Sequence, residues 1–247
     1  MDELLTRVLA SHGGLESWAQ VNRVTARLSL GGPFWGWKGW PDVYAGQTVT
    51  LDPRHEHVTF EPFTAPDRVS VFDVTPPERV EIRSTDGQLI EARDNPRASF
   101  PAYENDTVWD AIQVAYFTSA ATWSYLTAPF VFTYPDVESH EIEPWSEGGQ
   151  TWRRLAVSFP ASIATHNLDQ VFYYDEDFHQ RRMDYQPDVT GVPIAHYTHN
   201  PQRFDGFLFY TRRLVHLRGV DNVADQDFAP ITIDLHSVEL APDTENA

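Results

Sequence analysis

Short runs of alternating apolar and polar residues fill most of this chain and constrain its fold more than any other feature. Val24, Ala26, Leu28 and Leu30 alternate with polar residues, and side chains at every second position share one face of a β-strand. Similar runs recur throughout the chain, and Asp86-Gly87 between two of them is a strong signal for a tight hairpin turn. The pattern predicts about eleven consecutive antiparallel strands.

Two segments have helical spacing instead. Apolar residues between positions 4 and 18 recur every three or four residues, with a break at Gly13-Gly14. Residues 106–127 contain neither Pro nor Gly, and Thr107-x-x-Asp110 is a weak form of the capping box that starts a helix. This second helix is apolar on nearly every side, which predicts burial. We therefore expect a mainly β (α+β) fold: a large curved antiparallel sheet, or half-open barrel, wrapped around a buried helix, with an N-terminal helix.

Size and charge limit the function classes. A chain of 247 residues that is 41% apolar can bury a core without disulfides, and no linker divides it, so we expect a single domain over residues 1–247. The net charge of −18 disfavours nucleic acid and stable membrane anchoring as partners. The chain starts without the basic and apolar segments of a secretory signal, which predicts a cytoplasmic protein. The sequence leaves the oligomeric state open.

The order of elements and several short motifs resemble a known family. The motifs lie at residues 12–18, 94–100, 159–166, 181–185, 196–197, 204–206 and 211–213. Through them the chain is similar to uncharacterised bacterial proteins that resemble the lipoprotein-localisation superfamily, the outer-membrane lipoprotein carriers. The resemblance implies a half-open antiparallel barrel whose concave face is closed by helices. It also implies an apolar cavity, which in that superfamily takes up acyl chains.

An unusual density of aromatic side chains suggests where such a cavity would lie. In the segment 34–40, Trp35, Trp37 and Trp40 are interpreted as strand residues that form one wall of a ligand pocket. The alternative is that these indoles are ordinary core. The complete set of candidate ligand-binding residues is Trp35, Trp37, Trp40, Trp109, Tyr116, Trp123, Tyr185 and Tyr210.

Polar residues in the C-terminal half could carry acid–base chemistry. His166 and His196 are candidate proton carriers, Asp184 a candidate to orient a histidine, and Arg213 a candidate anion anchor. The alternative is a polar rim that satisfies strand ends. Arg182 and Asp184 share one strand face, either as a surface network or, if that face is concave, as a buried pair at a site.

These observations lead to two hypotheses. The preferred one is binding of a hydrophobic small molecule, acyl or polyketide-like, in an aromatic-lined half-barrel cavity. The alternative is a cofactor-independent enzyme, an isomerase, cyclase or lyase, that uses histidine acid–base chemistry on such a ligand. No nucleotide-binding loop, cysteine or metal-ligand spacing is present, so we expect neither a cofactor nor a metal.

Overall fold

The computed structural model describes residues 2–101 and 107–242. Its helices are α1 (Glu3–Ser11), α2 (Leu15–Trp18), α3 (Phe34–Trp37) and α4 (Ala111–Thr127), with 3₁₀ turns at Pro96–Ser99 and Phe130–Thr133. Its strands are β1 (Val21–Gly31), β2 (Gln47–Asp52), β3 (His57–Glu61), β4 (Arg68–Asp73), β5 (Arg79–Ser84), β6 (Leu89–Asp94), β7 (Glu138–Glu147), β8 (Gln150–Ser158), β9 (Asp169–Tyr174), β10 (Gln180–Tyr185), β11 (Ile194–Phe204), β12 (Phe207–Leu217) and β13 (Ile231–Pro242).

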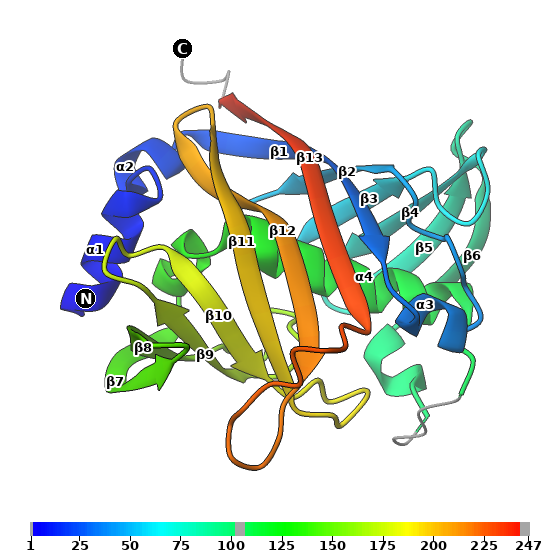
Figure 1. Cartoon of the computed structure of the whole chain (residues 1–247). Helices are drawn as coiled ribbons and strands as arrows, with labels where there is room; N and C mark the ends of the chain where they lie inside the picture. Colours follow the sequence, from blue (N-terminus) through cyan, green and yellow to red (C-terminus); the bar gives the residue numbers. More distant parts are fainter. Residues whose placement is uncertain (1, 102–106, 243–247) are drawn as a thin grey trace.

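All of these strands belong to one antiparallel sheet in the order β6-β5-β4-β3-β2-β1-β13-β12-β11-β10-β9-β8-β7. The described sheet therefore has 13 strands rather than about eleven. The pairing of β1 with β13 joins the N-terminal and C-terminal meanders. Strands β6 and β7 form the two edges and do not pair with each other, so the sheet remains open. It curves around α4, as Figure 1 shows, and the expected mainly β half-barrel with a buried helix is confirmed.

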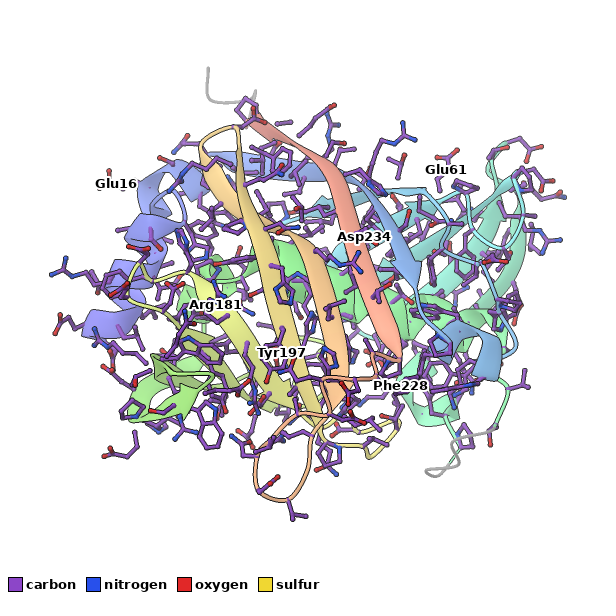
Figure 2. All side chains as sticks on the ribbon, in the orientation of Figure 1. Glu16, Glu61, Arg181, Tyr197, Phe228 and Asp234 are labelled. Carbon is purple, nitrogen blue, oxygen red and sulfur yellow. The ribbon has the colours of Figure 1, made fainter. Side chains whose placement is uncertain are left out.

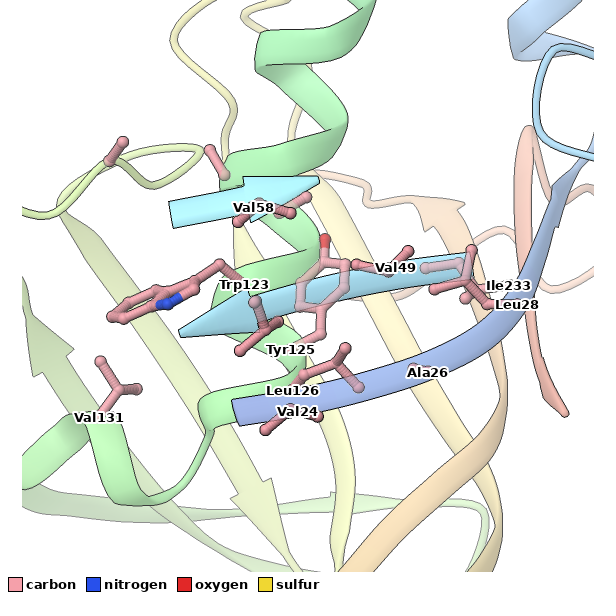
Figure 3. Packing of buried hydrophobic residues seen from close by; sticks show 14 of the residues in the cluster. Val24, Ala26, Leu28, Val49, Val58, Trp123, Tyr125, Leu126, Val131 and Ile233 are labelled. Atoms are coloured by element: carbon pink, nitrogen blue, oxygen red, sulfur yellow. The ribbon is translucent and has the colours of Figure 1, made fainter. Parts of the chain in front are cut away.

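Helix α4 is buried along nearly its whole length because it has no polar face. Trp123 is 1% exposed, and its indole N–H donates to the carbonyl oxygen of Asp52 over 2.8 Å. Figure 3 shows Leu126 of α4 against Val24 and Ala26 of β1. Apolar side chains on several sides of one helix thus fill the concave face of the sheet, which fixes where space can remain for a ligand.

Helix α4 starts one turn later than the sequence pattern suggests. Asp110 is the N-cap: its carboxylate accepts from the backbone N–H of Gln113, and the Gln113 side chain accepts from the backbone N–H of Asp110. The capping box is therefore Asp110-x-x-Gln113 and not Thr107-x-x-Asp110. Each of the two side chains accepts from one backbone N–H, so the capping box satisfies two backbone donors at the helix terminus. Asp106, the expected first residue, lies outside the described residues.

Substituting Asp110→Ala is expected to lower the free energy of unfolding by about 1 kcal/mol, because the backbone N–H of Gln113 loses its acceptor at the start of α4. Urea denaturation followed by circular dichroism measures this. Asp110→Asn keeps a cap acceptor and serves as the control, with stability close to that of the wild type. Equal stability of Asp110→Ala and Asp110→Asn would contradict the assignment of this cap.

The tryptophan-rich segment is helical, and its prediction as a strand is wrong. Gly32 has φ +95°, and a Cβ there would lie 2.3 Å from the carbonyl oxygen of Pro230. Pro33, with φ −69°, follows in a conformation suited to the start of a helix. Helix α3 then turns Trp35 inward to 3% exposure and leaves Trp37 46% exposed. The three tryptophans therefore do not share one face.

Candidate functional site

An apolar cleft of about 300 Å³ opens at one end of the half-barrel. Its walls come from α3, the loop after β10, the ends of β11 and β12, and the loop before β13. Phe117 of α4 and Tyr185 of β10 contribute from the concave interior. The cleft is lined by Phe34, Trp37, Lys38, Phe117, Tyr185, Pro187, Thr190, Val192, Ile194, Val215, Leu217, Phe228, Pro230 and Ile231. A cavity of this size and lining suits a small, largely hydrophobic molecule.

Strand register arranges the concave face below this cleft in successive rows. The row at the cleft pairs Tyr185 with Ile194 and Ile194 with Leu217. Two residues further along the strands, His196 lies between Met183 and Val215, and Val215 pairs with Ile231. The next row pairs Arg213 with Thr198 and with Ile233. Rows are about 7 Å apart, because every second residue of a strand faces the same way.

A hydrogen-bonded group of tyrosines and histidines lies at the inner side of the cleft. The Tyr185 hydroxyl lies 3.1 Å from the Tyr125 hydroxyl and 3.4 Å from Nδ1 of His196. Nε2 of His166 lies 3.1 Å from the Tyr125 hydroxyl, and the His166 ring stacks on the ring of Tyr185. One hydroxyl of this group, that of Tyr185, belongs to a residue that lines the cleft. The structure thus brings His166 and His196 together on the concave side.

Burial keeps the ring groups of this interior neutral near pH 7. Burial lowers the pKa of His166 to about 3 and lowers the pKa of His196 well below its usual value, with the Arg213 charge adding to the effect at His196. Burial likewise raises the pKa of Tyr125 to about 12 and raises the pKa of Tyr185 well above its usual value. Neutral histidines and tyrosines can donate or accept hydrogen bonds, but they supply no charge.

Arg213 is the charged member of this interior. It is 7% exposed, and its guanidinium lies 5.0 Å from the ring centre of Tyr125 and 5.8 Å from that of Tyr210. Burial lowers the pKa of Arg213, while the neighbouring tyrosines oppose that shift. An arginine nevertheless stays protonated in proteins. A separate small cavity of about 20 Å³ adjoins it, lined in part by Tyr125, Tyr210 and Ile233.

Asp184 lies on the opposite, convex face of the sheet and cannot orient His166 or His196. Its register partner on β11 is Ala195, whereas His196 pairs with Met183. Arg182 binds both carboxylate oxygens of Asp184, over 2.6 and 2.9 Å. This separation follows from strand alternation, since neighbouring residues of a strand point to opposite faces.

The Arg182–Asp184 pair is buried although it lies outside the barrel. Arg182 is 0% exposed and Asp184 4% exposed. Glu147, at the end of β7, binds Arg182 over 2.7 Å, and the Tyr173 hydroxyl donates to Asp184. The loop between β12 and β13 contributes the backbone carbonyl of Asn222, which accepts from Arg182 over 2.8 Å. The pair is therefore a buried structural network rather than an exposed one.

Most of the aromatic candidates belong to the core. Trp37 and Tyr185 line the cleft. Trp35, Trp109, Tyr116, Trp123 and Tyr210 are at most 5% exposed, and Trp40 packs against the core with its N–H on the carbonyl of Trp109. The sequence analysis did not identify the other lining residues, among them two loop segments, Pro187–Val192 and Phe228–Ile231. Their only signals are proline and glycine, which indicate turns without showing what the turns enclose.

His55 and His57 share one carboxylate instead of forming a metal site. Nε2 of His55 and Nδ1 of His57 lie 3.1 and 2.9 Å from the two carboxylate oxygens of Asp73. Among residues 2–101 and 107–242, no cluster of three or more His, Cys, Asp or Glu side chains could hold a metal ion. In the same described part, no helix is both long and apolar enough to cross a membrane.

Solved structures of other proteins have a similar fold. No protein-family model and no curated protein sequence matches the chain. A domain from Vibrio parahaemolyticus named for outer membrane lipoprotein sorting is similar over 99% of this chain and 94% of its own, with a TM-score of 0.51 and 8% identity. A DUF1329 family protein from Desulfovibrio piger is similar over 96% of this chain and 91% of its own, with a TM-score of 0.51 and 9% identity. The chain thus shares its fold with these two proteins.

Proposed function

We propose that this protein binds a hydrophobic small molecule, acyl or polyketide-like, in the cleft between α3 and the loops that flank β11 and β13. The observation that carries the proposal is the lining of that cleft. Aromatic and aliphatic side chains from five separate parts of the chain converge on one open space of about 300 Å³. Burying a ligand's apolar surface there contributes roughly 25 cal/mol per Å² before ordering costs are subtracted.

The fold supports the same proposal. The sheet is open and α4 fills most of its concave face, so space remains at the barrel end. The similar domain from Vibrio parahaemolyticus carries a name that refers to lipoproteins. The cleft also has a polar element: Lys38 lines it, and its ammonium lies 4.9 Å from the ring centre of Trp109. A ligand with an apolar body and a small polar group would match both parts of this lining.

Filling the cleft is expected to abolish binding. Thr190 lies in the loop after β10 and lines the cleft, so Thr190→Trp should place an indole in the ligand's space. We expect the affinity for a C12 alcohol, dodecanol, to fall at least about tenfold, since loss of each buried CH₂ costs about 0.8 kcal/mol. Isothermal titration calorimetry measures the affinity.

Thr48→Trp provides the matched control, because it adds the same side chain at an exposed position of β2 that is not part of the cleft lining. Its affinity for dodecanol should equal that of the wild type. Undiminished binding by Thr190→Trp would place the ligand elsewhere. Absence of dodecanol binding by the wild type, together with a clean mass in native mass spectrometry after addition of fatty acids and polyketides, would overturn the proposal.

A further inference from the structure

Arg213 carries a buried positive charge without a carboxylate to balance it. Its Nη2 donates to the backbone carbonyl of Tyr125 over 3.3 Å, and its Nη1 has no hydrogen-bond partner. Within residues 2–101 and 107–242, no Asp or Glu forms an ion pair with it. A buried cation without a counter-charge is strongly unfavourable, and a bound anion would compensate it.

The same part of the interior holds other unused polar atoms. Nε2 of His196 and the hydroxyl of Tyr174 are buried and have no hydrogen-bond partner. Both groups lie within the electric field of Arg213, whose charge adds to the effect of burial on the pKa of His196 and opposes it at Tyr174. A neutral histidine and a tyrosine can each donate a proton. Arg213, His196 and Tyr174 thus each have a buried polar atom without a hydrogen-bond partner, and of the three Arg213 lines the small inner cavity.

Strand register places this group directly beyond the cleft. Val215 and Ile231 line the cleft, and two residues along the same strands Arg213 and Ile233 line the small inner cavity. The two cavities are thus neighbours along β12 and β13. Between them lies the hydrogen-bonded pair of Tyr185, which lines the cleft, and Tyr125, which lines the inner cavity.

We propose that the ligand is a fatty-acid-type carboxylate, whose chain occupies the cleft and whose head group binds Arg213. This inference rests on the proposed function and adds the chemical class of the ligand. A planar guanidinium matches a carboxylate because it can donate two parallel hydrogen bonds to the two carboxylate oxygens. A single fixed cation in a cavity of about 20 Å³ suits a compact monoanion rather than a phosphate dianion. For the head group to enter, the Tyr125–Tyr185 pair must separate.

The test compares two ligands with the same chain and different head groups. Laurate and dodecanol are titrated into the wild type by calorimetry, in a buffer free of chloride and carboxylates. We expect laurate to bind at least about tenfold more tightly, because hydrogen bonds to charged groups discriminate by this factor or more. Arg213→Met should remove this preference, so that laurate and dodecanol bind with similar affinity, and Arg213→Lys should retain part of the preference.

Several outcomes would overturn the inference. Equal affinities of laurate and dodecanol for the wild type contradict it, even if Arg213→Met fails to fold. A preference for laurate that survives Arg213→Met contradicts it as well. If chloride raises the melting temperature of the wild type but not of Arg213→Met, and the two ligands bind equally, Arg213 binds a free anion and not a lipid head group. If dodecanol binds and laurate is not preferred, the proposed function stands and this inference alone fails.

Discussion

Substituting Asp184→Asn is expected to lower the free energy of unfolding by about 3–5 kcal/mol, the range found when one partner of a buried ion pair is removed. Arg182 would keep its full charge at 0% exposure and lose the partner that binds it at two points. Burial disfavours the charge of Arg182, but the hydrogen bonds and charge of Asp184 outweigh burial and raise the pKa of Arg182. Asparagine has nearly the same shape, so the loss reports on the charge and on the acceptor oxygen that the amide nitrogen replaces. Urea denaturation measures it.

The chain offers a matched control on the same sheet. Arg212 of β12 binds Asp234 of β13 over 2.7 Å, but these side chains are 45% and 39% exposed, and Asp234 lies on the outside of the sheet (Figure 2). Asp234→Asn should therefore change stability by about 1 kcal/mol or less. A similar, small effect for both substitutions would show that Glu147 alone compensates Arg182, and it would contradict the role given to Asp184.

This network also shows which structural feature the sequence predicts and which it does not. The alternation of Arg182, Met183, Asp184 and Tyr185 correctly predicts that Arg182 and Asp184 share a face. It cannot show that this convex face is covered, because the cover comes from Glu147 and from the loop that contains Asn222, both distant in sequence. Burial of a strand face depends on which other segments lie over it, and a local pattern does not contain that information.

The cleft, like this network, is only partly predictable from the sequence. Period-two runs and one helix without a polar face predict the open barrel, because each local pattern limits how it can be buried. Trp37 and Tyr185 are the two candidates that line the cleft. The tryptophan segment misleads because Gly32-Pro33 starts a helix, and a helix rotates residues two apart to different sides. The sequences of the loops that complete the lining indicate only turns. The positions of these loops follow from the register of β10 to β13.

Lowering the pH from about 6 to 5 is expected to destabilise the protein by up to about 3 kcal/mol, because three buried histidines resist protonation. Burial lowers the pKa of His12 to about 4 and the pKa of His166 to about 3, and it lowers the pKa of His196 well below its usual value. In the unfolded chain each histidine binds a proton near pH 6.5. Below that pH the unfolded state therefore binds up to three protons that the native state does not.

One buried acid acts in the opposite direction. Burial raises the pKa of Glu56 well above its usual value, so the native state already holds a proton that the unfolded state gains only near its ordinary pKa of 4.5. Falling pH through this window thus favours the native state at Glu56. The unfolded state binds up to three extra protons at the histidines, and the native state binds one extra proton at Glu56, so the net difference is about two. Each proton of this difference changes the free energy of unfolding by about 1.4 kcal/mol per pH unit.

The pH dependence of the free energy of unfolding, rather than its value at one pH, distinguishes this protonation effect from a loss of packing. His166→Gln removes one of the three histidines, so the dependence of the free energy of unfolding on pH should decrease by about 1.4 kcal/mol per pH unit, whatever the substitution costs at pH 7. His140→Gln, at an exposed position of β7, should leave the slope unchanged. Urea denaturation at several pH values gives both slopes. A wild-type slope near zero between pH 6 and 5 would mean that protons reach these histidines in the native state, and that the concave interior opens to water.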